Sequence, residues 1–263
     1  MCCCRNIGTI LILPILAAAL VSTPPAPIAA DIAWVAEGGF CEPETVLPLP
    51  DNTLLVSNVC GINESGKGYL TLLDAEGQAI EWRLVVGLDS PLGMTLSGDQ
   101  LYVVDNNRVK VFRWPQFEPI ETIELETSVA NDIAVAPDGT IYVTDTAKHH
   151  VVQRLPDDTR SILSGESQFR LANGIELHGK WLYVGGERLW RVEFESDDTL
   201  QITPVAGPLI RYRSDDEIEI LAGPGVSSAN HGFAPALGLA LIPTGYDNTV
   251  IAIRIPGEAE SDQ

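Results

Sequence analysis

A short strand with apolar residues on both of its faces recurs along the chain, and the other segments follow its rhythm. Its copies occupy residues 54–58, 101–105, 141–145 and 182–186, with a weaker fifth copy at 226–228. The valines that align them are separated by 47, 40, 41 and 42 residues. Several short strands repeated at this interval are typical of a β-propeller or a related β array. The pattern therefore predicts an all-β fold of repeated sheets.

A further strand follows each strong copy after a turn. These strands are expected at residues 68–74, 108–113, 150–155 and 189–194. Apolar residues alternate there with polar or charged ones, as in half-buried strands. Gly, Pro, Asn and Asp cluster at the strand ends, where turns require them. No helical period of useful length occurs after residue 30, which supports the all-β prediction.

The two ends of the repeated region decide how the ring closes. Residues 31–40 alternate well enough for a strand, and an N-terminal strand in a propeller often completes the last blade. At the other end, the step from Val226 to the next register-like residue, Ile242, is 16 residues instead of about 41. We therefore expect six-bladed ancestry with a shortened seam between the fifth and sixth blades. Closure with five blades is the alternative.

Residues 1–30 have the features of a secretory signal peptide. Arg5 precedes an apolar run at residues 10–21, and small residues follow. An exported, periplasmic or extracellular protein is expected, with no membrane contact after cleavage; a retained anchor is the alternative. Residues 31–257 would form one propeller domain, and the acidic tail 258–263 would be frayed. Cys41 and Cys60 then remain, and we expect them to form a disulfide, although two buried free thiols are possible.

The charge of the chain limits its partners. It carries 16 Lys and Arg against 36 Asp and Glu, which gives a net charge of −20. Such a surface repels nucleic acid and anionic membranes and attracts cations. Nucleic acid is therefore excluded as a partner.

Polar residues stand 10 to 12 residues ahead of four of the register valines, where the innermost strand of each blade begins. They are Glu44, Asn131, Asn173 and Asp216, and Pro91 is the counterpart in the second repeat. Innermost strands line the channel, so these side chains should converge. Two carboxylates and two amides suit a hard divalent cation, Ca²⁺ first, with Mg²⁺ or Mn²⁺ behind it. The alternative is that Asn-Asp and Asn-Gly are simply turn dipeptides.

The runs 87–105, 131–146 and 173–186 resemble the SMP-30/gluconolactonase/LRE-like family of six-bladed propellers. The resemblance extends over roughly residues 40–255. In that family a Glu, two Asn and an Asp hold a divalent metal, which implies the same role for Glu44, Asn131, Asn173 and Asp216. The family pattern has Gly after the Asp, where this chain has Glu217.

The resemblance implies hydrolysis of a small-molecule substrate, a lactone or related ester. A bound Ca²⁺ or Zn²⁺ would act as Lewis acid, and Asp216 would act as general base. The chain has no Gly-X-Ser-X-Gly nucleophile motif and no Cys/His zinc spacing, and His178 is expected in a surface turn. The rival interpretation is a non-catalytic binding module whose metal is structural or absent.

Overall fold

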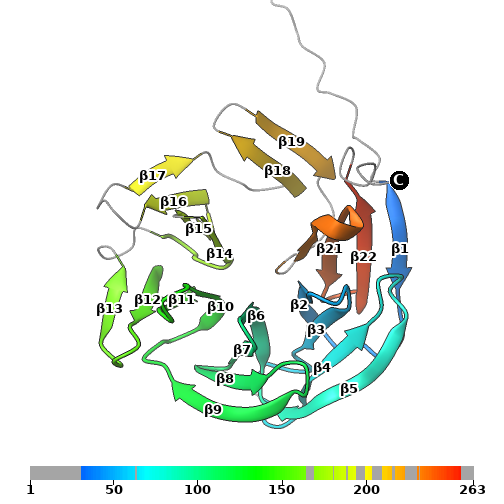
Figure 1. The fold of residues 1–263 in the computed structure, drawn as a ribbon, viewed down its shortest axis with the longest axis horizontal. Helices are drawn as coiled ribbons and strands as arrows, with labels where there is room; N and C mark the ends of the chain where they lie inside the picture. The colour runs from blue at the N-terminus through cyan, green and yellow to red at the C-terminus, as the bar shows by residue number, and fades with distance from the viewer. Residues whose placement is uncertain are drawn as a thin grey trace, which may run out of the picture.

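The repeated strand of the sequence forms the second strand of four antiparallel sheets in the computed structural model of the chain (Figure 1). The structure describes residues 31–62, 64–163, 169–179, 181–187, 189–193, 199–202, 209–214, 217–222, 230 and 232–255. The predicted signal peptide and acidic tail lie outside these residues. Within the described ranges, no helix has the length and apolar character needed to cross a membrane.

Four successive sheets have four strands each, in chain order. The first contains β2 (Pro43–Pro48), β3 (Leu54–Asn58), β4 (Gly68–Leu73) and β5 (Ala79–Leu88). The second contains β6 (Pro91–Ser97), β7 (Gln100–Asp105), β8 (Arg108–Arg113) and β9 (Glu118–Glu124). The third contains β10 (Ala130–Val135), β11 (Ile141–Asp145), β12 (His150–Arg154) and β13 (Arg160–Leu163). The fourth contains β14 (Ile175–His178), β15 (Trp181–Gly185), β16 (Leu189–Glu193) and β17 (Thr199–Ile202).

The closing sheet joins the two ends of the chain. Its order is β1 (Ile32–Ala36), β22 (Thr249–Arg254), β21 (Leu239–Thr244) and β20 (Gly232–Ala234), with a 3-10 turn, η1 (Pro235–Leu237), after β20. Strand β1 pairs antiparallel with β22, as predicted for an N-terminal strand that completes the last blade. The ring is thereby closed by hydrogen bonds between segments more than 200 residues apart.

The seam between the fourth sheet and the closing sheet contains a smaller unit. Strands β18 (Leu209–Ser214) and β19 (Glu217–Ala222) pair as a two-stranded sheet. Among the described residues this sheet is the short one, whereas the closing sheet has four strands. The expected fifth register strand at 226–228 and the predicted ligand Asp216 lie outside the described residues. In Figure 1 the β18–β19 pair lies at the rim of the ring.

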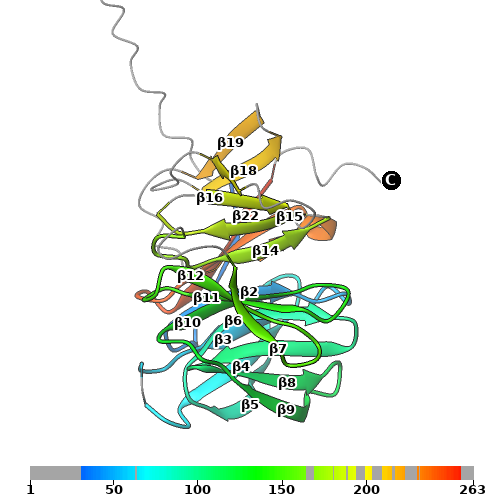
Figure 2. The same cartoon turned by 90° about the vertical axis from the view of Figure 1, so that its left-hand side faces the viewer.

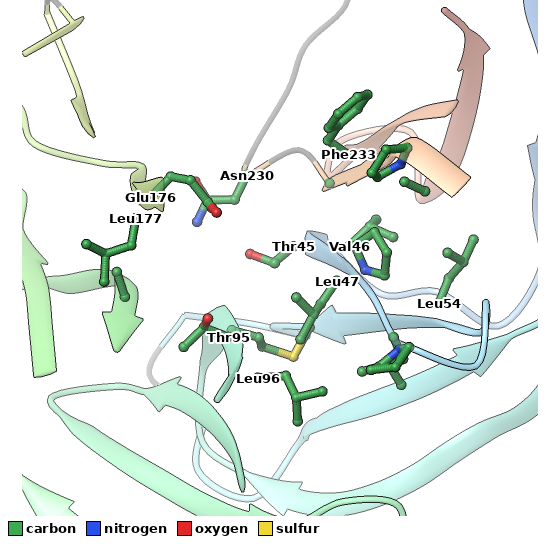
Figure 3. Close-up of a pocket in the computed structure, with 18 of the residues that line it drawn as sticks. Thr45, Val46, Leu47, Leu54, Thr95, Leu96, Glu176, Leu177, Asn230 and Phe233 are labelled. Carbon is green, nitrogen blue, oxygen red and sulfur yellow. The ribbon is translucent and has the colours of Figure 1, made fainter. Parts of the chain in front are cut away.

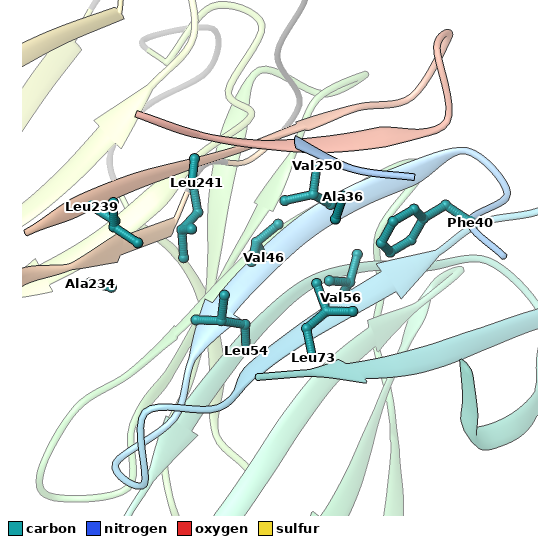
Figure 4. Packing of buried hydrophobic residues seen from close by; sticks show 11 residues of the cluster. Ala36, Phe40, Val46, Leu54, Val56, Leu73, Ala234, Leu239, Leu241 and Val250 are labelled. Atoms are coloured by element: carbon teal, nitrogen blue, oxygen red, sulfur yellow. The ribbon is translucent and has the colours of Figure 1, made fainter. Parts of the chain in front are cut away.

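The core lies between neighbouring sheets, and this explains why the register strand is apolar on both faces. Leu54 and Val56 of β3 face the closing sheet, where they pack with Leu241 and Val250 (Figure 4). Leu55, between them in sequence, faces the second sheet. Strands buried on both faces give continuous apolar runs rather than alternation. Figure 2 shows the ring from its edge, with successive sheets stacked against one another.

A disulfide joins Cys41 and Cys60, as the sequence predicts. Cys41 lies just ahead of β2, and Cys60 lies just after β3. The backbone N–H of Cys60 also donates to the Cys41 carbonyl at 3.1 Å. The bond therefore fixes the end of the first sheet from which the innermost strand starts.

Candidate functional site

Strand pairing defines one equivalent position at the start of each innermost strand. The pairs that align the first four sheets are Val46 with Val56, Met94 with Val103, Ile133 with Val143, and Ile175 with Val184. The residues two places before the first member of each pair occupy what we call the ring positions. They are Glu44, Leu92, Asn131 and Asn173.

Three of the predicted ligands, Glu44, Asn131 and Asn173, thus occupy equivalent places in three sheets. In the second sheet the ring position is Leu92 rather than Pro91, because Val103 pairs with a residue nine places earlier instead of ten. No position can be given for Asp216, which lies outside the described residues.

Asn230 borders the ring positions, and the sequence analysis missed it. Its backbone N–H donates to the Glu44 carbonyl at 2.8 Å, and it forms a parallel bridge with Thr45. The closing sheet is therefore joined directly to the first sheet at the ring. A sequence signal existed, because Ala-Asn occurs at 130–131, 172–173 and 229–230. The predicted repeat register passes through Val226 and points to Asp216, so it does not include the Ala-Asn pair at 229–230.

The ring positions of the first three sheets lie in β-bulges. Two residues of the innermost strand oppose one of its partner between Pro43 and Val46, between Pro91 and Met94, and between Ala130 and Ile133. A bulge redirects side chains and leaves backbone groups without ladder partners. Here it turns the start of each innermost strand away from regular pairing.

Two hydroxyl groups satisfy the backbone at these bulges. The Ser57 hydroxyl accepts from the Thr45 N–H at 3.0 Å and donates to the Leu92 carbonyl at 2.8 Å. In the third sheet, the Thr144 hydroxyl accepts from the Asp132 N–H at 2.9 Å and donates to the Asn173 carbonyl at 2.7 Å. Each hydroxyl thus connects one sheet to the ring residue of the next.

Asp132 holds the third and fourth sheets together. Its Oδ1 accepts from the Ile133 N–H, and its Oδ2 accepts from the Ile175 N–H, both at 2.9 Å. The side chain is only 8% exposed. Gly93 of the second sheet faces Asp132 so closely that a Cβ atom would overlap Oδ1. Glycine is therefore required at this position of β6 by close approach.

Three carboxyl groups share an environment that disfavours their charge. Burial raises the pKa of Glu44 from 4.5 to about 7, and its hydrogen bond from the Thr45 hydroxyl offsets only part of this effect. Burial also raises the pKa of Asp132 well above its usual value, and the charges of Glu44 and Glu176 add to the rise. The pKa of Glu176 is raised by burial as well. The charge of His178 opposes part of the rise in the pKa of Glu176, and burial outweighs it. The site is therefore rich in buried carboxyl groups.

Two buried amide atoms at the ring have no hydrogen-bond partner among the described residues. They are Asn131 Oδ1 and Asn230 Nδ2. An unpaired buried oxygen beside ionisable carboxyls fits a hard cation, whose preferred ligands are carboxylate and amide oxygens. No group of three His, Cys, Asp or Glu side chains gathers as metal ligands in the described part of the chain. A cation bound there would need the amide oxygens as well as Glu44.

A cavity of about 900 Å³ extends from the ring positions along the innermost strands. Figure 3 shows Thr45, Glu176 and Asn230 around the same open space. The far part of the lining includes His178, which is the last residue of β14 and not part of a turn as expected. No Lys or Arg belongs to the lining in the described residues. The volume lies in the range of small-molecule sites.

Comparison with known proteins identifies a repeat and a fold. The NHL repeat family matches residues 127–153, which include β10, β11 and most of β12. No curated protein matches the chain. The repeat match therefore covers most of the third sheet and the three residues that precede it.

Solved structures of similar shape extend over most of the chain. A streptogramin B lyase structure has a TM-score of 0.60 at 12% identity and covers 84% of this chain and 97% of its own. Virginiamycin B lyase from Staphylococcus aureus has a TM-score of 0.59 at 10% identity, covering 84% and 98%. A catalytically inactive variant of that enzyme with quinupristin has a TM-score of 0.55 at 10% identity, covering 84% and 99%. At these identities the similarity establishes the β-propeller fold alone.

Proposed function

We propose that the protein is an exported, metal-dependent hydrolase of lactones or related small esters, as the SMP-30/gluconolactonase/LRE-like resemblance implies. The observation that carries the proposal is the set of oxygen donors at the ring positions. Glu44, Asn131 and Asn173 stand at equivalent places, and Asn131 Oδ1 is buried without a partner. Leaving a buried acceptor unpaired is costly, and coordination of a cation would offset that cost.

The proposed roles of the site residues are metal binding, proton transfer and support of the scaffold. A divalent ion, Ca²⁺ first, with Mg²⁺, Mn²⁺ or Zn²⁺ as alternatives, would supply Lewis-acid polarisation of the substrate carbonyl. Glu44 would contribute negative charge to its binding, and Asn131 and Asn173 would contribute neutral oxygens. Asp216 is proposed as the general base that takes a proton from water. Asp132 holds the scaffold instead, because both of its oxygens accept backbone N–H groups.

A second candidate is a binding module without catalysis. The match to the NHL repeat, which is often found in binding modules, favours it. Turnover distinguishes the two candidates, whereas metal binding alone does not.

The test combines metal binding and hydrolysis with one preparation of the mature chain. After removal of metals with EDTA, we expect Ca²⁺ to raise the midpoint of thermal unfolding, because a ligand of the native state stabilises it by about 2.7 kcal/mol at one hundred times its Kd. We expect lactone opening only in the presence of the ion, and the proton that the hydroxy-acid product releases is used to measure it. Stabilisation by Ca²⁺ without opening of any lactone would favour the binding module. If Ca²⁺ neither stabilises the protein nor supports lactone opening, the proposed metal site is wrong.

Matched variants connect these effects to the ring. Glu44→Gln and Asn131→Ala should each abolish the response to Ca²⁺ and the hydrolysis. Glu81→Gln is the control, because Glu81 is exposed on the outer strand β5. If Asn131→Ala responds to Ca²⁺ and opens lactones like the unmodified protein, the assignment of the ring as the metal site is wrong.

A further inference from the structure

The lining of the cavity changes from polar to apolar with distance from the ring positions. Its first residues, Thr45, Asp132 and Asn230, are polar. Farther along the strands the lining becomes mainly apolar and includes Leu47, Leu96, Val135, Leu177 and Phe233. Figure 3 shows Leu47, Leu96 and Leu177 coming from three different sheets around this space. A polar end and an apolar wall together describe a site for an amphipathic molecule.

Asn230 marks the polar end as a binding position. Only 9% of its surface is exposed, and its Nδ2 has no hydrogen-bond partner among the described residues. Its Oδ1 and Asp132 Oδ2 each lie 3.9 Å from where a Cβ atom of Gly174 would stand, so the amide faces the start of the fourth sheet. A buried donor without an acceptor is unfavourable, and an oxygen of a ligand would satisfy it.

The charges of the cavity restrict which ligand fits. Asp132, Glu176 and His178 line it, Glu44 is hydrogen-bonded to the lining residue Thr45, and no Lys or Arg belongs to the lining in the described ranges. An anionic ligand would find no Lys or Arg to bind it, and ionisation of any of the three carboxyl groups would repel it. A cationic head group would suit the carboxylates but would leave Asn230 Nδ2 without its acceptor. An uncharged carbonyl compound meets both conditions.

We propose that this cavity binds an uncharged lactone or ester that carries an alkyl or acyl chain. Asn230 Nδ2 donates to an oxygen of its polar end, and the chain lies along Leu47, Leu96 and Leu177. The inference rests on the proposed function, since it names the substrate class of that hydrolase. The cavity of about 900 Å³ has room for a chain of this kind.

Binding of analogues that resist hydrolysis tests the inference separately from catalysis. We would titrate γ-ethyl, γ-butyl, γ-hexyl and γ-octyl lactams into the mature protein by calorimetry, with EDTA and with Ca²⁺. Each added methylene should tighten binding about threefold to fourfold until the cavity is filled. Affinity that does not change with chain length would overturn the proposal. Tighter binding of octylammonium than of the octyl lactam would also overturn it and would assign the cavity to cations.

Variants locate the two ends of the ligand. Leu177→Ser and Leu47→Ser, on different sheets, should each weaken the octyl lactam about tenfold and leave the ethyl lactam nearly unchanged. Asn230→Ala should weaken both lactams by a similar factor. Ile120→Ser, at an exposed position of the outer strand β9, is the control. Loss of octyl lactam affinity in the control alone, or in none of the variants, would contradict the assignment.

The lactam-binding experiment and the hydrolysis experiment can fail independently of each other. Lactam binding that depends on chain length, without metal-dependent hydrolysis, would retain the cavity assignment and reject the hydrolase. Metal-dependent hydrolysis of short and long lactones at equal kcat/KM, without lactam selectivity, would retain the hydrolase and reject the cavity assignment. A polyhydroxylated sugar lactone opened faster than the alkyl lactones would likewise reject it.

Discussion

The Thr144 hydroxyl donates a hydrogen bond to the backbone carbonyl of Asn173 across 2.7 Å, and so joins the third sheet to a ring residue of the fourth. The same hydroxyl accepts from the Asp132 N–H at 2.9 Å. One side chain therefore serves two backbone groups at the place where the metal ligands are proposed. Its loss should affect both the stability of the ring and the position of Asn173.

Thr144→Val removes this hydroxyl at nearly constant shape. We expect a loss of about 2 kcal/mol in the free energy of unfolding, because a buried N–H and a buried carbonyl lose their partner. Thr144→Ser keeps the hydroxyl and should cost less than about 1 kcal/mol. Urea unfolding of the three proteins measures the difference. A loss for Thr144→Val no larger than the loss for Thr144→Ser would show that the two hydrogen bonds do not contribute the expected stability.

Gly93 is predicted to be intolerant of any side chain. A Cβ atom there would overlap Asp132 Oδ1 and stand 2.9 Å from the Asn131 carbonyl oxygen. Because part of the obstacle is backbone, relief would require the second and third sheets to separate. Gly93→Ala should cost about 3 kcal/mol in the free energy of unfolding. Gly185→Ala is the matched control, since its Cβ atom would meet its nearest neighbour at an ordinary 3.8 Å.

The repeated strands were predictable because burial on both faces leaves a strong apolar signal. Leu54, Leu55 and Val56 are all fully buried, and β3 and β11 have the predicted bounds. The closing pair of β1 and β22 followed from the need to cover a sheet edge. The disulfide followed from an even cysteine count in a chain expected to be exported.

The site was predictable only in part, for two physical reasons. The hairpin between β6 and β7 is one residue shorter than the hairpin between β2 and β3, so a fixed offset from the valine gave Pro91 where pairing gives Leu92. The seam broke the repeat, so Asn230 was missed although its backbone N–H donates to the carbonyl of the ring residue Glu44. Glu176 and His178 carry no motif at all, because a strand residue faces the cavity through the packing of neighbouring sheets. The predicted roles of the metal ligands, and of Asp216 as base, stay predictions.

The disulfide between Cys41 and Cys60 should stabilise the whole ring. It closes a loop over a sequence separation of 19 residues, for which chain entropy gives about 3 kcal/mol. The double variant Cys41→Ala, Cys60→Ala should therefore unfold roughly 6 to 12 °C lower. A reducing agent should lower the melting temperature of the unmodified protein by a similar amount. The double variant should not respond to the reducing agent, and a response there would point to another cause.

The pKa of Glu44 predicts an unusual pH dependence for the metal-free protein. Burial raises this pKa from 4.5 to about 7, so the folded state binds a proton that the unfolded state has lost. Stability should therefore be greatest below about pH 4.5 with respect to this group and should fall as the pH rises to about 7. The contribution is at most about 3 kcal/mol. Urea unfolding in EDTA across this range measures it.

Glu44→Gln separates this contribution from those of the other carboxyl groups. The variant should lose much of the slope between about pH 4.5 and 7 and should be more stable than the unmodified protein above that range, because it has no charge to bury. Asp132 and Glu176, whose pKa values are also raised, should keep a residual slope of the same sign. Glu81→Gln, on the outer strand, should leave the profile unchanged. Ca²⁺ should reverse the trend in the unmodified protein, since a cation binds the ionised carboxylate. A Glu44→Gln profile parallel to that of the unmodified protein would show that this carboxyl does not titrate in the predicted window.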